Sequence, residues 1–323
     1  MKIFAKSVTS LARRASEEVP FLPRWRVGIV VSIAILLITA SPVLAQKTLR
    51  WKLKAGEQLQ VNVTQQKTAT TTIAGKPVKM TEEMTFETLW SVDSADEKQA
   101  KITQTVKRLA MKMQLGDAAP IAYDSASKAT PVGTAKEIAA AVKPLFEEGS
   151  SLLVTMNTRG EVLSAEPSPK LAQHWKSPGK KEIDSTTQEL LKRSIILLPE
   201  GSVGTAEVGK TKWNSEREVE MRNGKVKQSL EFVYGGEADA AGQKLDKIDF
   251  TSTLQITPGG PKSLKLTLKE QKQTGHALFS AELGRVVSAE QTQTLVTEAP
   301  YRETIITVTV ESTVKTVVTS VKK

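Results

Sequence analysis

The chain has no cysteine, only two histidines and few aromatic residues. The absence of cysteine excludes disulfide bonds, thiolate catalysis, cysteine-ligated metals and lipid attachment through a cysteine side chain. A chain without disulfides has to be stabilised by its own apolar core, and this chain is long enough for one large domain or two small ones. Disulfide scaffolds and thiol chemistry are therefore excluded before any motif is considered.

The chain also lacks an apolar run of the length that a membrane-spanning helix needs, about 20 residues. Its longest apolar segment, residues 27–40, follows a basic stretch and leads to Val43-Leu44-Ala45. A basic region, a short apolar segment and a small residue at the cleavage point are typical of a secretory signal peptide. We therefore expect residues 1–45 to be a signal peptide and the protein to be exported, either periplasmic or extracellular. The alternative is an inner-membrane protein anchored by an uncleaved leader.

The charge of the chain points to no particular partner. The chain has 45 Lys and Arg residues against 35 Asp and Glu residues, a net charge of +10, and these charges are scattered. A nucleic-acid-binding protein is expected to have a basic stripe with interleaved aromatic residues. We expect no nucleic-acid partner and no disulfide partner. The partner stays unknown, with a lipid or an envelope protein as the kinds to consider.

Most of residues 46–323 alternate between apolar and polar side chains. The alternation is clearest in residues 59–63, 84–92, 250–256 and 306–318. A period of two residues is typical of strands in an antiparallel sheet that has one buried face. Between Val106 and Leu109 the apolar positions change parity, which predicts a β-bulge.

The C-terminal run is long for a strand. Its apolar residues, Ile306, Val308, Val310, Val314 and Val318, fall on one face, and its threonines fall mostly on the other. Paired on both sides, this run would tie the sheet together. Left at an edge, it would be a surface for association or aggregation.

Short turns separate the runs. Asn223-Gly224 predicts a hairpin turn, because Asn-Gly is a strong signal of a short hairpin, and Ala74-Gly75-Lys76-Pro77 predicts another hairpin loop. Pro258-Gly259-Gly260-Pro261 predicts a further turn.

Two segments have a helical period. Residues 134–146 begin with Thr134 and Glu137 at the spacing of a capping box, and Pro144 weakens the last turn. The second segment runs from Asp184 or Ser185 to Leu198. Each has an apolar stripe and is expected to lie on the sheet. Residues 167–181, rich in proline, glycine and lysine, are expected to form an exposed loop.

The predicted fold class is α+β and mainly antiparallel β. Curved sheets from two similar β-rich halves are expected to carry two amphipathic helices packed on the sheet. Residues 160–166 match residues 284–290 at five of seven positions, and Gly56 and Gly209 are candidates for equivalent starts; chance similarity is the alternative. The expected division is a signal peptide (1–45), a first half with both helices (46–205) and a second half (206–323) that shares one continuous sheet with the first.

No pattern indicates a reaction. His174 and His276 have neither metal-ligand spacing nor a serine nucleophile motif beside them. Asp93, Asp96 and Glu97 lack the spacing of a calcium loop and are typical of a solvated hairpin turn. We expect no catalytic residues, no metal and no cofactor.

The start of the mature chain carries a resemblance. A long basic leader, the run Leu49-Arg50-Trp51-Lys52-Leu53-Lys54-Ala55-Gly56-Glu57 and a threonine-rich β chain are similar to an uncharacterised family of secreted proteins common in planctomycete bacteria. That family has no assigned activity, so the resemblance implies no site residues. The order of elements also resembles periplasmic lipoprotein-carrier folds, in which a curved antiparallel sheet wraps helices around an apolar cavity. This second resemblance implies a shape and no function.

Three functions are compatible with these features. The first is a non-enzymatic envelope protein that binds a hydrophobic or amphipathic ligand between the sheet and the helices. Its candidate lining residues are the apolar stripes of the two helices: Ile138, Val142, Leu145, Phe146, Leu190, Ile195 and Leu198. Alternatively, these residues close a dry core. The second is a structural cell-surface module that associates through strand edges, and the third is a hydrolase of unrecognised type.

Overall fold

The computed structural model describes residues 46–174, 196–204, 208–221, 224–240, 242–258, 266–301 and 304–321. The predicted signal peptide lies outside these ranges, as do residues 184–195 of the predicted second helix, including Leu190 and Ile195. The predicted turns at residues 222–223 and 259–261 also lie outside them.

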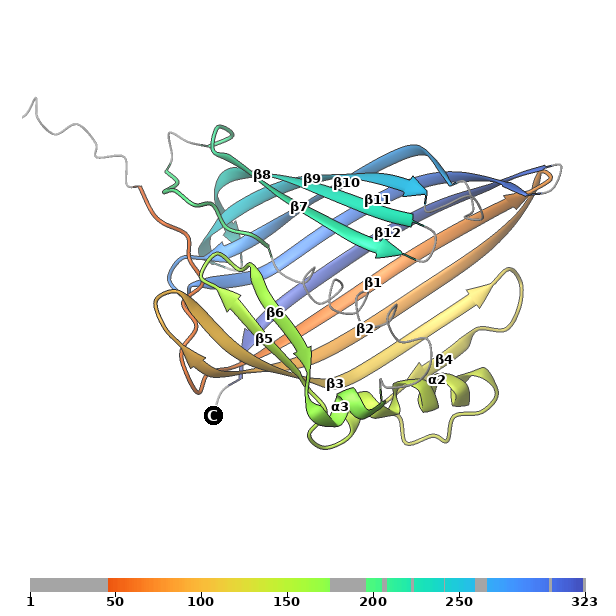
Figure 1. The fold of residues 1–323 in the computed structure, drawn as a ribbon, viewed down its shortest axis with the longest axis horizontal. Helices are drawn as coiled ribbons and strands as arrows, with labels where there is room; N and C mark the ends of the chain where they lie inside the picture. The colour runs from red at the N-terminus through yellow and green to blue at the C-terminus, as the bar shows by residue number, and fades with distance from the viewer. Residues whose placement is uncertain are drawn as a thin grey trace, which may run out of the picture. The chain divides into compact units, whose positions relative to one another are not determined.

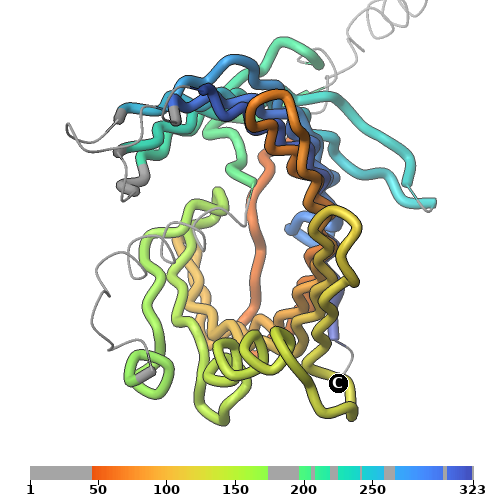
Figure 2. Tube along the Cα trace, turned by 90° about the vertical axis from the view of Figure 1, so that its right-hand side faces the viewer, coloured from red at the N-terminus to blue at the C-terminus, as the bar shows by residue number. Residues whose placement is uncertain are grey.

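The described residues form one antiparallel sheet of 12 strands that is open and curved (Figures 1 and 2). The strands are β1 (Gln58–Ile73), β2 (Lys76–Ala95), β3 (Gln99–Leu115), β4 (Ile121–Asp124), β5 (Leu152–Asn157), β6 (Val162–Pro167), β7 (Lys212–Met221), β8 (Gly224–Ala240), β9 (Gln243–Pro258), β10 (Thr267–Ser280), β11 (Arg285–Tyr301) and β12 (Thr304–Ser320). Their order is β6-β5-β3-β2-β1-β12-β11-β10-β9-β8-β7, and β4 pairs with β3. The prediction of a mainly antiparallel β fold is therefore confirmed.

Strand β12 lies in the middle of the sheet. It pairs with β1 on one side and with β11 on the other over nearly its whole length. The C-terminal run therefore ties the sheet together, and the hypothesis that it forms a free edge is wrong. We call the face that carries Leu59, Val61 and Val318 the inner face, and the opposite face the outer face. Val310 lies on the inner face and Thr309 on the outer face, because their registers with β1 are unbroken.

The predicted bulge in β3 is confirmed. Val106 pairs with Thr88 and Arg108 pairs with Glu87, so Lys107 is the extra residue. A bulge shifts the parity of all later side chains. The apolar residues before and after it therefore both lie on the inner face.

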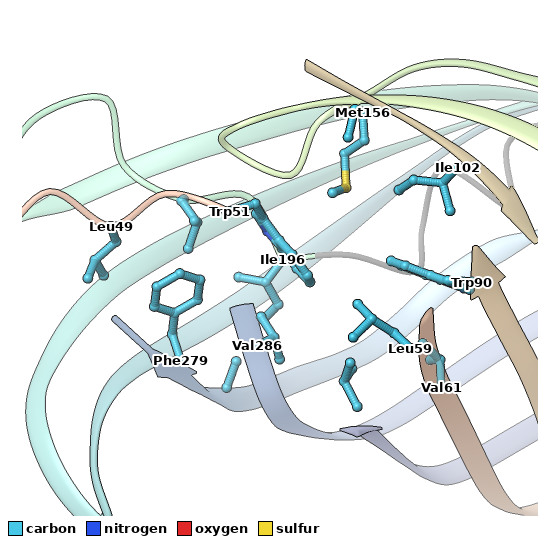
Figure 3. Packing of buried hydrophobic residues seen from close by; sticks show 14 of the residues in the cluster. Leu49, Trp51, Leu59, Val61, Trp90, Ile102, Met156, Ile196, Phe279 and Val286 are labelled. Carbon is cyan, nitrogen blue, oxygen red and sulfur yellow. The ribbon is translucent and has the colours of Figure 1, made fainter. Parts of the chain in front are cut away.

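The buried core lies at one end of the inner face, where the extended segment of residues 46–57 crosses the space that the sheet encloses (Figure 2, orange). The backbone N–H of Trp51 donates to the carbonyl of Thr158, and that of Lys52 donates to the carbonyl of Gly284, each at 2.8 Å. These carbonyls belong to the β5–β6 and β10–β11 turns, so the segment bridges two distant parts of the sheet. The Trp51 ring lies 6.5 Å from the rings of Trp90 and Phe279, centroid to centroid (Figure 3).

The first predicted helix is confirmed as α2 (Thr134–Val142), but its capping box is wrong. Gly133, with a φ of 54°, is the N-cap, and no side chain caps the helix. Thr134 is therefore the first helical residue and not the cap. Glycine adopts the positive φ of this cap position without steric cost. At Lys143 the chain continues as a 3-10 helix, η1 (Lys143–Phe146), since Pro144 has no N–H for an α-helical bond. None of the described helices has the length and hydropathy that crossing a membrane requires.

A short helix occupies part of the segment that was expected to be an exposed loop. Helix α3 (Pro169–His174) buries Leu171. The hydroxyl of Ser168 accepts a hydrogen bond from the N–H of Leu171 at 3.4 Å and donates one to the carbonyl of Gly149 at 2.8 Å. The loop prediction is wrong here, because serine at the cap followed by proline is a helix start.

The helices contact one region of the sheet. α2 contacts β4 and η1, η1 contacts β3, and α3 contacts β6 and η1. The end of the predicted second helix is wrong as well, since Ile196–Leu198 have no regular secondary structure. The N–H of Leu198 instead donates to the carbonyl of Arg159 at 2.8 Å.

The division into two similar halves stays a prediction, and two hydrogen bonds support it. The N–H of Gly56 donates to the carbonyl of Val92, and the N–H of Gly209 donates to the carbonyl of Tyr234, each at 2.8 Å. Both glycines have positive φ angles and precede the first strand of their half. Strands β1, β2, β3, β5 and β6 and strands β7 to β11 also follow one another across the sheet in the same direction.

Candidate ligand-binding face

The inner face continues beyond the buried core along the long central strands. The residues at its far end are mostly apolar and lie on β1, β2, β11 and β12. We call them the distal apolar face: Ala69, Ile73, Val78, Met80, Leu295, Ala299, Ile306, Val308 and Val310. They share the inner face because each is paired in register with another member of the group on a neighbouring strand or alternates with one along its own strand.

Most side chains of the distal apolar face are half-buried or exposed, in contrast to the core. Val78 is 45% exposed, and Leu115, which extends the same face on β3, is 57% exposed. Apolar residues scattered singly on a surface need no explanation, but a contiguous apolar group on a concave face is typical of a binding surface.

A row of polar side chains separates the distal apolar face from the core. Six residues on six consecutive strands face one another directly, and we call them the polar belt: Glu82, Lys67, Ser312, Gln293, Gln273 and Ser252. Each is on the inner face, so the belt crosses the sheet from β2 to β9. One positive and one negative side chain make the belt neutral overall.

The polar belt is only partly satisfied by the described residues. Lys67 Nζ lies 3.4 Å from a carboxylate oxygen of Glu82, with the two side chains 30% and 20% exposed. Gln273 is 7% exposed, and its side-chain oxygen Oε1 has no hydrogen-bond partner in the part of the chain that the structure describes. An unpaired buried acceptor costs about 1–3 kcal/mol. A group that supplies a donor at Gln273 would recover this free energy.

A glycine shapes the inner face beside the belt. Gly275, two residues from Gln273 on β10, lies beneath the ring of Phe250. A Cβ atom there would lie 2.3 Å from Cζ of Phe250 and 2.5 Å from the carbonyl oxygen of Glu290. Glycine is therefore required for the close approach of the ring to the sheet.

A second polar cluster, at the end of the inner face that holds the buried core, has a structural role. Asp246, which is 2% exposed, accepts a hydrogen bond from the hydroxyl of Tyr234 at 2.8 Å and lies 2.6 Å from Lys47 Nζ. Burial acts to lower the pKa of Lys47, but hydrogen bonds to Asp246 and Glu237 outweigh it and hold that pKa above its ordinary value. Burial and the hydrogen bond to Asp246 raise the pKa of Tyr234 to about 12. The cluster fastens the segment around Lys47 to β8 and β9.

A pocket of about 340 Å³ lies near the buried core, beside Trp51, Met156 and the β2–β3 turn. The backbone N–H groups of Lys98 and Gln99 donate to Asp96 and lower its pKa. The predicted hairpin turn is therefore confirmed for Asp96 and Glu97, whereas Asp93 lies within β2. Trp51, Ala100 and Met156 of the buried core line this pocket, so we treat it as the weaker candidate.

The residues predicted to line a ligand cavity are only partly brought together. Leu198 is fully buried in the core, and Leu145 packs against the edge of the same core. Ile138, Val142 and Phe146 are half-buried in α2 and η1, next to β4 and β3. Their role in ligand binding stays a prediction. His276 lies within β10.

Sequence reasoning missed the polar belt. The available signal was a polar residue at an inner-face position of an alternating run, such as Lys67 between Val63 and Ala69. The convergence of six such residues depends on the register of six strands, which a sequence pattern does not contain.

No protein-family model and no curated protein matches the chain. Among solved structures, lipovitellin, in a structure that concerns its lipid–protein interactions, aligns with 84% of this chain at 12% identity and a TM-score of 0.43. This chain spans 26% of the lipovitellin chain. A Bacteroides fragilis protein described as exported and of YmcC-like fold aligns with 86% of this chain and 100% of its own length, at 11% identity and a TM-score of 0.25.

An outer-membrane channel from Pseudomonas putida F1 aligns with 83% of this chain and 97% of its own length, at 10% identity and a TM-score of 0.23. These findings are compatible with an uncharacterised family. Similarity at this level says nothing about the activity of this chain.

Proposed function

We propose that this protein is exported and binds an amphipathic lipid whose apolar chain lies on the distal apolar face. The observation that carries the proposal is that face itself, a mostly apolar surface on the concave side of four neighbouring strands, interrupted by Thr71 and Thr297. From Ala69 to Ile73 it extends over four residue steps, about 13 Å along a strand. An acyl chain spans one leaflet of a bilayer, about 15 Å, so the face accommodates most of the length of one chain.

The free energy for binding comes from removing apolar surface from water. Each square ångström of apolar surface that a ligand covers contributes about 25 cal/mol. The side chains of the face are already in place on paired strands, so little ordering free energy opposes binding. The polar belt limits the apolar face on the side of the core, which favours a ligand with one polar end.

The strand-edge hypothesis has less support. Strand β12, its main feature, is paired on both sides. Strand β7, at the end of the strand order, carries charged residues that pair with those of β8, as in Lys212 with Glu231 at 3.0 Å and Lys227 with Glu216 at 2.9 Å. Charged side chains along an edge oppose pairing with a second chain.

The test compares two neighbouring residues of β12 that face opposite ways. Val310→Glu places a carboxylate on the distal apolar face, and Thr309→Glu places the same carboxylate on the outer face. Binding of a fluorescent fatty acid to residues 46–323 is measured for both variants and the parent. We expect Val310→Glu to weaken binding at least tenfold and Thr309→Glu to leave it within twofold.

Equal binding by all three proteins, or no binding by the parent, would contradict the proposal. Thermal unfolding of each variant serves as the control, because a loss of binding is informative only if the sheet is intact.

A further inference from the structure

The polar belt contains the groups that a large uncharged polar headgroup needs. Two of its six side chains are amides and two are hydroxyls, and each of these both donates and accepts hydrogen bonds. The two charged members, Lys67 and Glu82, are next to each other and compensate one another. A charged headgroup would lack a compensating charge within the belt, because Lys67 and Glu82 already compensate one another.

The length of the belt limits the size of the headgroup. It crosses five strand spacings, from Glu82 on β2 to Ser252 on β9, which is about 24 Å at about 4.8 Å per spacing. A single small headgroup would reach only one or two of the six residues. A chain of sugar units would reach most of them.

Gln273 provides a second, independent observation. Its side chain is more than nine-tenths buried, lies between Gln293 and Ser252 in the belt, and has an unpaired acceptor oxygen in the described part of the chain. A buried polar group without a partner is unusual and calls for an explanation. A hydroxyl group of a ligand would donate to this oxygen.

We propose that the polar belt binds the uncharged sugar headgroup of a glycolipid. This inference rests on the proposed function, because the acyl chains of the same ligand lie on the distal apolar face. Sugar hydroxyls hydrogen-bond to Gln273, Gln293 and Ser312, and the Lys67–Glu82 pair takes hydroxyls at the other end. Ser252 is 5% exposed and accepts a hydrogen bond from Nε2 of Gln228 at 3.0 Å, so it forms the buried end of the belt.

The probes are three amphiphiles with the same dodecyl chain: dodecyl maltoside, dodecylphosphocholine and dodecanoate. Each is titrated below its critical micelle concentration into residues 46–323 by calorimetry. We expect dodecyl maltoside to bind at least about tenfold more tightly than either of the others, which corresponds to a few additional hydrogen bonds.

Near-isosteric variants locate the preference. Gln273→Met and Gln293→Met keep the shape of the side chains and remove their amides, and each should reduce the preference for dodecyl maltoside about fivefold. Thr294→Val, on the outer face of the same strand as Gln293, should leave the preference unchanged. Because Gln273→Met removes an unpaired acceptor, it should not lower the melting temperature. Gln293→Met tests the role of a belt amide in the sugar preference at a half-buried position.

The outcomes separate the two proposals. If the three amphiphiles bind equally, if a charged one is preferred, or if both methionine variants keep the preference for the sugar, the glycolipid inference is overturned while lipid binding stands. If none of the three binds, the proposed function itself is overturned.

Discussion

Lys47 Nζ lies 2.6 Å from Oδ1 of Asp246, a carboxylate that is almost completely buried. The two residues are far apart in the sequence, and their contact fixes the first residues after the predicted leader to strand β9. Removing the ammonium leaves a buried carboxylate with less compensation. We expect Lys47→Met to lower the free energy of unfolding by about 2 kcal/mol, measured by urea denaturation. Lys54→Met, at an exposed position of the same segment, should change it by less than about 0.5 kcal/mol.

The pKa of Tyr234 predicts a loss of stability in alkali. Its pKa is raised to about 12 by burial and by the hydrogen bond to Asp246, whereas an unfolded tyrosine has a pKa of about 10. The stabilisation is therefore complete below pH 10 and is lost as the pH rises from 10 to 12, because only the unfolded chain releases the proton there.

Denaturation of the parent and of Tyr234→Phe across this range checks the assignment. The variant should be less stable at pH 7 by about 1–2 kcal/mol and should lose less stability between pH 10 and 12. The raised pKa of Lys47 leaves some dependence on pH in the variant. Parallel curves for the two proteins would be inconsistent with the assignment.

Because Phe250 lies so close to Gly275, we predict that an alanine at residue 275 lowers stability more than a glycine-to-alanine change usually does. Gly275→Ala should lower stability by about 2 kcal/mol, since the new methyl group overlaps both the ring and the backbone of Glu290. Gly201→Ala is the matched control, because a Cβ there meets nothing within 4 Å. Thermal unfolding of the two variants makes the comparison, and equal melting temperatures would show that the ring does not lie where the structure has it.

Because residues 46–57 cross between two parts of the sheet, we predict that Trp51 is essential for the core. Trp51→Ala should lower the free energy of unfolding by about 3–5 kcal/mol, because the indole packs between Trp90 and Phe279 and bridges both sides of the sheet. Chemical denaturation followed by circular dichroism would measure this. A decrease of less than about 1 kcal/mol would mean that the crossing segment is not part of the core.

Local patterns in the sequence were enough to predict much of the sheet. The alternation of β12 and the parity change that marks the bulge at Lys107 are properties of single strands, and both are confirmed. The hairpin predicted at residues 74–77 is confirmed, but its loop is only Ala74 and Gly75, since Lys76 and Pro77 belong to β2. The predictions were wrong at two helix starts. A capping box was predicted where Gly133 is the N-cap, and at Ser168 the loop-like composition of the segment was given more weight than the serine–proline helix start.

The candidate site could not be predicted, because it depends on pairing between distant strands. Lys67 and Gln273 belong to one belt only through the central position of β12 and the register of β11. A shift of one residue in any ladder would move a belt residue to the outer face. The sequence pattern places a residue on a face of its own strand and does not specify its neighbours across the sheet.

The most direct test of the central claim uses the absence of cysteine in the chain. A single cysteine is introduced at Val310 on the distal apolar face, or at Thr309 on the outer face, and is labelled with a fluorescent bimane group. Each labelled protein is then titrated with a fatty acid brominated in the middle of its chain. We predict saturable quenching of the label at residue 310 and none at residue 309; equal quenching at both positions, or none at either, would contradict binding of an apolar chain to the inner face.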